Sequence, residues 1–499
     1  MKPINFGLLL SLMLGPAAVT GALALFAPLS PIPAHAETIL PHPMAPNATT
    51  HYVSSVSGSD DNDCTQGAPC RSIQRAVDQA ADGDEVLIAA FDNAASALYT
   101  ATGMAPVVSV DKSLALRGGY VYVHLVGPGT WQRNPLLPSL STVDGQNTRQ
   151  GIHISGDVTV ILEWLTLRNG HAERGGNLYA ENATARFAAV WVSGGTADYG
   201  GGLYLKNCHT EFDAVNFELG DLGDLSAAIL VQDNTADYGG GMYVDGGDPA
   251  LSAFAVVSNT ATADGGGIYL NQGEALIAGG VILENQAAQR GGGLFLDDSY
   301  ARIAGTAVYS NTASQGGGFY LDGPLAIWPL NIPIIANNYV RYNQGGGFYI
   351  YKAIAGLANN IIADNSGGQA AMYLEAASPY LIHNTFANNA SSSALHLAHE
   401  PGQVFPPSLP IPSLPFLTNN IIASHTVGVY ADSTGLPYPL ENRVTLEGTL
   451  WWDNGARSDG PGQVVSDADV SGDPRFICIG TLPECVAPYH LGDGSAAVD

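Results

Sequence analysis

A glycine cluster followed by an apolar–aromatic pair returns along most of the chain. From the first such aromatic residue to the last, the steps are 25, 39, 26, 26, 25, 29 and 24 residues. A second marker, an apolar residue three positions before an asparagine, repeats with steps of 25, 26, 26, 32, 22 and 24 residues. Two independent markers with one period argue against chance similarity, so we predict a repeat protein with a unit of about 25 residues. The aromatic members are Tyr179, Tyr204, Tyr243, Tyr269, Phe295, Tyr320, Tyr349 and Tyr373, and the asparagines are Asn234, Asn259, Asn285, Asn311, Asn343, Asn365 and Asn389.

A unit of this length fits few architectures. Helical repeats need about 33 residues or more, and triple glycine among many Val, Ile, Tyr and Thr residues disfavours helices. The Leu-x-x-Leu-x-Leu spacing of leucine-rich repeats is absent. Three short strands and three turns per unit do fit, stacked as a parallel β-helix whose coils lie about 4.8 Å apart. We therefore expect an all-β chain that forms a single solenoid.

Between Val86 and Trp452 there is room for roughly 14 coils, a rod on the order of 70 Å long. Inward Leu, Ile, Val and Ala would fill its centre, and glycine would permit the sharp turns. The repeated Asn is expected to adopt the left-handed conformation and to hydrogen-bond the Asn above and below. Longer steps mark insertions at 212–225, 323–333 and 401–415, which we expect on turns, where binding sites often form.

The two ends of the chain differ from the repeat. Residues 1–36 have the form of a signal peptide, with one Lys, a long apolar stretch and a small-x-small end; a retained anchor is the alternative. Residues 37–51 form a leader, residues 52–452 the β-helix with its N-terminal cap, and residues 453–499 a closing segment. Apolar residues at helical spacing within 72–81 predict a short helix that caps the open end of the stack. We expect a secreted or cell-surface protein without an integral membrane part after signal removal.

The cysteines fit an exported protein. Cys64 and Cys70 are six residues apart, and Cys478 and Cys485 are seven apart. Each pair could close a small loop as a disulfide in an oxidising compartment. Metal binding is the alternative, although neither pair has the two-residue spacing of a zinc knuckle. Cys208 is left over and is predicted to be a buried thiol inside a strand.

The net charge of the chain limits the classes of partner that it can bind. The formal net charge is −27, with 18 basic residues among 499. So few cations cannot form a basic stripe, which excludes nucleic-acid binding as a function class. The charge also opposes an anionic polymer unless a metal ion intervenes. We expect a monomeric rod that contacts polysaccharides or cell-surface glycans.

Several segments outside the repeat carry a resemblance to known proteins. They are Tyr52-Val53-Ser54, Gly58-Ser59-Asp60, Cys64 to Gln74, Ala81-Asp82-Gly83-Asp84, Leu116-Arg117-Gly118-Gly119-Tyr120, Asp473-Pro474-Arg475-Phe476, Tyr489-His490-Leu491 and Gly494 to Asp499. Together with the repeat, they resemble the right-handed parallel β-helix superfamily, the fold of pectate lyases, and more closely the secreted glycine-rich β-helix proteins. The apolar-x-x-Asn and Gly-Gly-x-Ile elements are similar to polymorphic outer-membrane protein repeats.

The resemblance implies the fold over about residues 52–499, but it does not decide activity, because the fold hosts enzymes, adhesins and structural proteins. In the proteins that the chain resembles, the closing block continues past the position of Asp499. We therefore expect the chain to be a fragment that lacks a surface anchor or a further domain.

The aromatic residues of the repeat are the first candidate for a binding site. In Leu203-Tyr204-Leu205, period-2 alternation turns the two leucines inward and the tyrosine outward. Repetition then gives one exterior row of rings that stack on each other, contributing roughly 0.5–1.5 kcal/mol per pair. Stacking is one role for the row, and a platform for sugar rings is the other. The candidate ligand-binding residues are Tyr204, Tyr243, Tyr269, Phe295, Tyr320 and Tyr349.

The second candidate is acidic. Asp198, Asp237 and Asp264 lie just before their glycine clusters, with Arg290 at the same turn one coil on. If the turns align, the three carboxylates stack on one edge and could bind Ca²⁺. Pectate lyase-like enzymes, which the chain resembles, use such a site with a basic residue that abstracts a proton from the sugar. Solvated turn acids are the alternative.

No motif in the sequence gives a convincing general acid and base pair. Our first hypothesis is therefore an exported, non-catalytic β-helix protein that binds glycans or other cell-surface partners, in the manner of an adhesin. The alternative is a polysaccharide lyase or glycoside hydrolase of the pectate lyase-like class.

Overall fold

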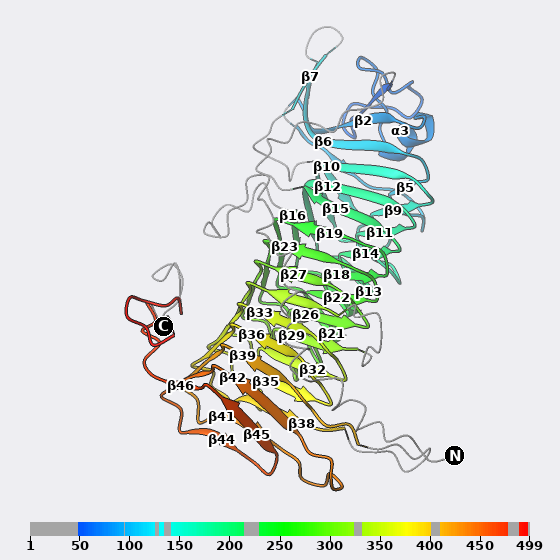
Figure 1. Cartoon of the computed structure of the whole chain (residues 1–499). Helices are drawn as coiled ribbons and strands as arrows, with labels where there is room; N and C mark the ends of the chain where they lie inside the picture. Colours follow the sequence, from blue (N-terminus) through cyan, green and yellow to red (C-terminus); the bar gives the residue numbers. More distant parts are fainter. Residues whose placement is uncertain are drawn as a thin grey trace, which may run out of the picture.

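Successive coils of the chain stack as a rod (Figure 1). The computed structural model describes residues 48–93, 95–124, 129–133, 141–213, 229–323, 332–400, 410–477 and 489–497. In a regular coil the chain passes from β18 (Met242–Asp245) to β19 (Ala250–Ser252), β20 (Phe254–Val257) and β21 (Thr260–Asp264), and then enters β22 (Ile268–Asn271) of the next coil. Equivalent strands of neighbouring coils pair in parallel, so the described chain is a parallel β-helix of all-β class, as predicted.

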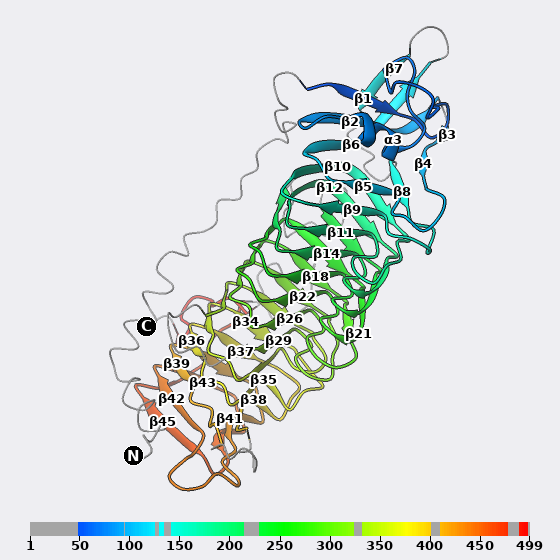
Figure 2. The ribbon, with the colours of Figure 1, turned by 90° about the vertical axis from the view of Figure 1, so that its right-hand side faces the viewer.

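One 13-stranded sheet carries the aromatic residues and is called the aromatic sheet below. It forms one wall along the rod, and Figure 2 shows many of its strands stacked in order from β5 to β41. In chain order its strands are β5 (Val108–Val110), β9 (Ile152–Ser155), β11 (Leu178–Glu181), β14 (Leu203–Lys206), β18, β22, β26 (Leu294–Asp297), β29 (Phe319–Asp322), β32 (Phe348–Tyr351), β35 (Ala370–Glu375), β38 (Ser393–Ala398), β41 (Val427–Ala431) and β44 (Ala456–Asp459).

The other walls belong to a 29-stranded sheet, called the long sheet, which opens with long strands and then divides into two rows. The opening strands are β1 (Thr50–Val53), β2 (Asp84–Asp92), β6 (Leu114–Val123), β10 (Thr159–Arg168) and β12 (Thr184–Ser193), with β3 (Ala95–Ser96), β4 (Leu98–Tyr99) and β7 (Thr130–Arg133) beside them. The first row holds β15 (His209–Asp213), β19, β23 (Leu276–Ala278), β27 (Arg302–Ala304), β30 (Ile334–Ala336), β33 (Gly356–Ala358), β36 (Tyr380–Ile382), β39 (Phe416–Thr418), β42 (Arg443–Glu447) and β45 (Gln463–Asp467). The second row holds β8 (Thr142–Asp144), β16 (Ile229–Gln232), β20, β24 (Val281–Leu283), β28 (Ala307–Tyr309), β31 (Tyr339–Arg341), β34 (Ile361–Ala363), β37 (Thr385–Ala387), β40 (Ile421–Ala423), β43 (Leu450–Trp452) and β46 (Val470–Ser471).

A short sheet of four strands and a single described helix complete the architecture. The short sheet consists of β13 (Thr196–Tyr199), β17 (Thr235–Tyr238), β21 and β25 (Gln286–Ala287). The helix α3 (Ile73–Gln79) begins at Ser72, whose side chain accepts a hydrogen bond from the Arg75 backbone N–H. Its apolar face is buried in the main core. It lies at the N-terminal end of the stack, so the predicted capping helix is confirmed (Figure 2).

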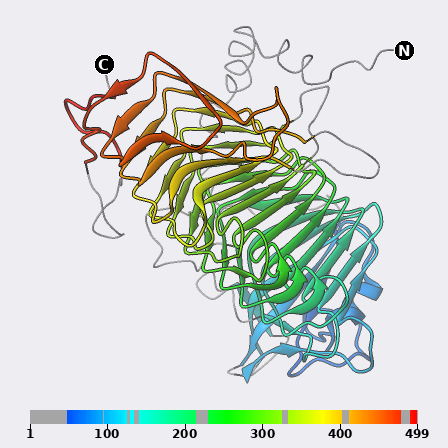
Figure 3. The same ribbon diagram turned by 90° about the horizontal axis from the view of Figure 1, so that it is seen from below.

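The core runs along the axis of the rod. In β14, Leu203 and Leu205 are buried in it, while Tyr204 belongs to a separate cluster of rings. The same alternation of inward aliphatic and outward aromatic residues repeats in the neighbouring coils, because parallel in-register pairing places equivalent residues above one another. Figure 3, a view from below, shows the coils one behind another along the chain.

A buried ladder of asparagine side chains holds one turn of each coil. The amide nitrogen of each Asn donates to the Oδ1 atom of the next Asn at 2.9–3.1 Å. The same Oδ1 also accepts from the backbone N–H of the preceding ladder residue in most steps. The predicted contact of each Asn with those above and below is therefore confirmed. The ladder consists of Asn177, Asn234, Asn259, Asn285, Asn311, Asn343, Asn365 and Asn389.

The backbone conformation expected for these asparagines is wrong. From Asn234 onward, the left-handed residue is the one before each ladder Asn, for example Ser258 with φ 54° and Glu284 with φ 55°. The left-handed residue makes the bend, and the Asn that follows points inward, where its amide is fully hydrogen-bonded. A second ladder, which the sequence analysis missed, lies at the preceding turn of the coil, between the first and second rows of the long sheet. There too, a left-handed residue precedes each Asn. It consists of Asn338, Asn360, Asn384 and Asn420.

The glycine clusters serve two purposes. Gly200, the first of its cluster, has φ 65°, a conformation that favours glycine. Gly201, the second, lies against the next coil, where a Cβ atom would stand 2.4 Å from the Thr235 carbonyl oxygen. The first glycine thus makes the predicted sharp turn, and the second allows adjacent coils to approach closely.

The stacking extends beyond the predicted boundary at residue 452, because β44, β45 and β46 add to the sheets as far as Ser471. The chain then returns to the long sheet. The Tyr489 side chain is buried there, with its hydroxyl donating to Asp364 Oδ1 at 2.7 Å and its ring 5.1 Å from the Arg341 guanidinium. Tyr489 and Leu491 thus pack on the outside of the rod.

The cysteine predictions have different outcomes. Cys64 and Cys70 form a disulfide, as predicted. Cys208 is a buried free thiol, as predicted, but it lies between β14 and β15 and not inside a strand. Cys478 and Cys485 lie outside the described residues, as do residues 1–36, predicted to be a signal peptide, and most of the predicted leader. Residues 214–225, 324–331 and 401–409, which make up most of the three predicted insertions, also lie outside them.

Candidate functional site

The repeated aromatic residues form one row on the outer face of the aromatic sheet, as predicted. In-register pairing places each ring beside its counterpart in the next coil. Ring centroids from Tyr204 to Tyr349 are 4.6–5.2 Å apart, with interplanar angles of 12° or less. The row continues through Tyr373 to His396.

Stacking leaves these rings almost no free surface. From Tyr204 to Tyr349 each residue is between 1% and 9% exposed. Each ring covers the face of its neighbour, and Tyr199 packs edge-on against Tyr243 from the side. A sugar ring needs an open aromatic face to stack on, so the predicted platform does not fit the structure in that form. The row instead acts as an external spine that joins the coils.

A second row of side chains lies on the same outer face, two residues further along each strand. We call it the polar edge. Its members are in register from coil to coil, and each is half-buried rather than fully solvated. The polar edge consists of Glu181, Lys206, Asp245, Asn271, Asp297, Asp322, Tyr351 and Glu375.

Ring hydroxyls of the aromatic row hold carboxylates of the polar edge. Tyr204 Oη donates to Asp245 Oδ2 at 2.9 Å, and Tyr269 Oη donates to Asp297 Oδ2 at 2.7 Å. The hydroxyl of Tyr349 donates to Glu375 in the same way. Burial, followed by the hydrogen-bonded carboxylate, raises the pKa of each of these tyrosines. The rings therefore stay protonated and keep the carboxylates oriented.

Members of the polar edge also bind each other along the rod. Lys206 Nζ lies 2.8 Å from Glu181 Oε1, and Asn271 Nδ2 donates to Asp245 Oδ1 at 2.8 Å. These contacts use only part of the capacity of the carboxylates, because each ionised carboxylate offers about four acceptor positions. The edge thus presents oriented acceptors to the solvent over several coils.

Arg290 is the cation at the centre of this face. Its guanidinium makes a two-point contact with Asp264, from Nε to Oδ1 at 3.0 Å and from Nη2 to Oδ2 at 2.7 Å. It lies 4.8 Å from the ring centroid of Phe295 and 5.2 Å from that of Tyr320. Its Nη1 atom is 3.5 Å from Asp322 Oδ2. Arg290 is therefore a fixed charge that links the short sheet to the aromatic row.

The predicted calcium residues are not brought together. Asp198 and Asp237 occupy equivalent positions in β13 and β17, but a register shift between β17 and β21 pairs Asp264 with Tyr238. Asp264 is neutralised by Arg290, and Asp237 accepts a hydrogen bond from Thr262. Within the described ranges, no three His, Cys, Asp or Glu side chains gather closely enough to hold a metal ion. Calcium binding by this trio stays a prediction, which the geometry does not favour.

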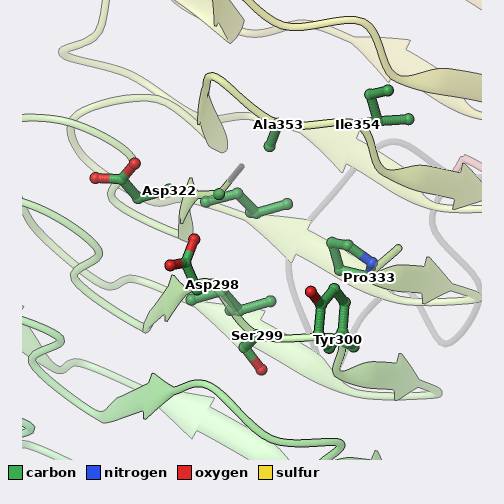
Figure 4. Close-up of a pocket in the computed structure, with 10 residues that line it drawn as sticks. Asp298, Ser299, Tyr300, Asp322, Pro333, Ala353 and Ile354 are labelled. Carbon is green, nitrogen blue, oxygen red and sulfur yellow. The ribbon is translucent and has the colours of Figure 1, made fainter. Parts of the chain in front are cut away.

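Beside the polar edge lies a small cavity with two carboxylates in its wall, Asp298 and Asp322 (Figure 4). Burial, together with the charge of Asp297, raises the pKa of Asp322 to about 6. The same two causes raise the pKa of Asp298. Sequence analysis missed the polar edge, although a polar residue two positions after each repeated aromatic was its visible signal.

Comparison with known proteins agrees with this architecture. Residues 201–391 match the family model described as a right-handed beta helix region, and the fold is a right-handed parallel β-helix, as predicted. No curated protein matches the chain.

Similar solved structures are distant. The A-module of mannuronan C-5 epimerase AlgE6 from Azotobacter vinelandii is 13% identical over 86% of this chain and 92% of its own, with a TM-score of 0.26. The alginate lyase AlyF-OU02, solved with G6, is 12% identical over 84% and 87%, with a TM-score of 0.34. Pectate lyase Pel9A is 10% identical over 90% and 91%, with a TM-score of 0.27. TM-scores this low support no inference about activity.

Proposed function

We propose that this is an exported β-helix protein that binds glycans along the polar edge. The observation that carries the proposal is the row itself, eight half-buried side chains in register on one face. Solvated surface acids need no such order, whereas here ring hydroxyls and neighbouring side chains orient the carboxylates. Preorganised polar groups of this kind favour a ligand that forms many directional hydrogen bonds.

A polysaccharide has the matching chemistry. Its hydroxyls can donate to Asp245, Asp297 and Glu375, and its oxygens can accept from Asn271 and Lys206. A polymer that repeats along its length also suits a row that repeats once per coil. Because the net charge is −27, a neutral glycan is a better ligand than an anionic one.

Export is supported by the disulfide between Cys64 and Cys70, because structural disulfides persist in oxidising compartments. The part of the chain that the structure describes contains no helix with the length and apolarity to cross a membrane. We place the protein outside the cell or at its surface, as the N-terminal sequence predicts.

Glycan retention by charge-matched variants tests the proposal. D245N/E375Q removes two charges from the polar edge, whereas E447Q/D467N removes two charges from exposed positions on the long sheet. On a glycan array, we expect the first variant to lose retention at least tenfold and the second to bind like the wild type. Equal retention by both folded variants would contradict a role for the polar edge.

A further inference from the structure

The buried part of the aromatic row is flanked by an accessible ring on each side. From Tyr204 to Tyr349 the ring centroids are 4.6–5.2 Å apart, and these rings are buried. On one side, Tyr179 lies 5.3 Å from Tyr204. On the other side, Tyr373 lies 4.8 Å from Tyr349. Both flanking rings are half-buried, so the stack joins two points of the surface through rings that solvent hardly reaches.

Three of the buried rings hold a proton acceptor. In each case the phenol donates its hydrogen bond to a carboxylate on the next coil, and we call the three pairs the proton-coupled pairs. Burial raises the pKa of each phenol, so the ring is protonated at rest. A phenol that loses one electron becomes strongly acidic, and a carboxylate within hydrogen-bond reach is placed to take its proton. The proton-coupled pairs are Tyr204 with Asp245, Tyr269 with Asp297, and Tyr349 with Glu375.

The rings between the pairs lack such an acceptor. At the position that a carboxylate occupies in the pairs, the next coil offers Asn271 to Tyr243 and Tyr351 to Tyr320. Phe295 has no hydroxyl at all. These three rings nevertheless stack on their neighbours with interplanar angles of 12° or less. They therefore bridge the proton-coupled pairs, so that an electron can cross them, but they are not places where a neutral phenoxyl radical is stabilised.

We propose that the aromatic row is a relay for one-electron oxidation, which carries an oxidising equivalent along the rod. A one-electron oxidant in solution, an oxygen radical or an oxidised metal complex, takes an electron from Tyr204 and is itself reduced by one electron. The phenol proton passes to Asp245, which leaves a neutral phenoxyl radical. An electron then crosses the intervening ring from Tyr269 to this radical. The proton on Asp245 returns to Tyr204, while Tyr269 gives its own proton to Asp297.

The same exchange moves the radical from Tyr269 to Tyr349, whose proton passes to Glu375. The half-buried Tyr373 is the exit, because its ring stacks on Tyr349 and is open to solvent. There a thiol in solution supplies one electron through the Tyr373 ring, the proton on Glu375 returns to Tyr349, and the thiol releases its proton to water as it becomes a thiyl radical. The resting relay is restored. This activity goes beyond glycan binding and does not depend on it.

A tethered photo-oxidant tests the relay in the full chain. N182C places a thiol at an exposed turn three residues after Tyr179, where a ruthenium tris-bipyridine maleimide is coupled; the chain without N182C, carried through the same reaction, gives the background. A flash with a cobalt(III) electron acceptor generates the oxidant, and a nitroso spin trap with mass spectrometry locates the radicals. We expect adducts on Tyr373. Adding Y269F, which removes one hydroxyl and keeps the stack, should lower them by about tenfold or more.

Two further variants separate the relay from its surroundings. Y380F removes the hydroxyl of a half-buried tyrosine on the long sheet and should leave the Tyr373 adducts unchanged. D297N keeps every ring but removes one proton acceptor, so it should lower the adducts as Y269F does. Adducts confined to Tyr179 in N182C would overturn the relay. Equal Tyr373 adducts with and without Y269F or D297N would overturn it too, because oxidation would then bypass the row. Either result leaves the glycan proposal to its own test.

Discussion

Asn259 hydrogen-bonds Asn285 twice, with its amide nitrogen 2.9 Å and its backbone nitrogen 3.0 Å from the same Oδ1 atom. Asn285 repeats both bonds toward Asn311. The Oδ1 atom of each ladder Asn therefore accepts two hydrogen bonds from the preceding coil, and its amide nitrogen donates to the next coil. The polar groups of the buried turn are thus paired without water. The ladder is a structural spine inside the rod, just as the aromatic row is one outside.

Replacing a ladder residue should destabilise the rod. N285A leaves the Asn259 donors, the Val256 carbonyl oxygen and Asn311 without their partner. Unpaired buried groups cost about 1–3 kcal/mol each, so we expect a loss of about 3 kcal/mol or more in the free energy of unfolding. Urea denaturation measures it. Q286A, at the exposed neighbouring position, should change stability by about 0.5 kcal/mol or less, and equal losses in the two variants would rule out the ladder as the cause.

The end of this ladder makes stability depend on pH. His425 is buried, and its Nε2 atom lies 3.1 Å from the Asn389 amide nitrogen, so the ring must be neutral to accept that bond. Burial lowers the pKa of His425 to about 4, whereas the unfolded value is near 6.5. Between these values the unfolded chain binds the extra proton and the folded chain does not. Stability should therefore fall as the pH is lowered from about 6.5 to about 4.

Urea midpoints of the wild type and of H425N at pH 7 and pH 4.5 measure this effect. Asn continues the ladder without a titrating group, so H425N should lose less stability on acidification than the wild type. An identical loss in both proteins would show that groups other than His425 cause the loss of stability at acid pH.

The aromatic row should respond to loss of a ring and not to loss of a hydroxyl. Y269A removes a buried ring that stacks on Tyr243 and Phe295, and such truncations cost about 3–5 kcal/mol. Y269F keeps the stack and removes only the bond to Asp297, so we expect a loss of about 1 kcal/mol. Thermal unfolding of the two variants gives the comparison. A mild effect of Y269A would contradict the structural role of the stack.

Thiol counting tests the cysteine pair that lies outside the described residues. If Cys478 and Cys485 form a disulfide like Cys64 and Cys70, the denatured, unreduced protein has one free thiol, that of Cys208. Three free thiols would mean that the second pair is reduced. Titration with a thiol reagent in denaturant distinguishes the two results.

Much of the fold could be predicted because the repeat places chemically equivalent residues at equal steps. Leu203-Tyr204-Leu205 alternates between core and surface, and a step of 26 residues puts Tyr269 beside Tyr243. The stacking of the rings was predicted, but their near-complete burial was not, because the sequence does not reveal how closely rings on adjacent coils approach. The misplacement of Asp264 has a local cause, an irregular register between β17 and β21 that the glycine alignment does not show.

The candidate site escaped prediction for a related reason. Asp297 and Asp322 are 25 positions apart, and neither belongs to a compact motif. Their pairing depends on the exact register of β26 and β29, and the raised pKa of Asp322 depends on burial that only the packed coils provide. Neither residue was a candidate in the sequence analysis, whereas the register of the two strands places them side by side on adjacent coils.

Carbodiimide labelling of carboxyl groups, with and without the glycan that the array identifies, tests whether the polar edge is the binding surface. Bound glycan should protect Asp245, Asp297, Asp322 and Glu375 and leave Glu447 and Asp467 on the long sheet labelled as before. Glycan binding with unchanged labelling of the polar edge, or with protection confined to the long sheet, would contradict it.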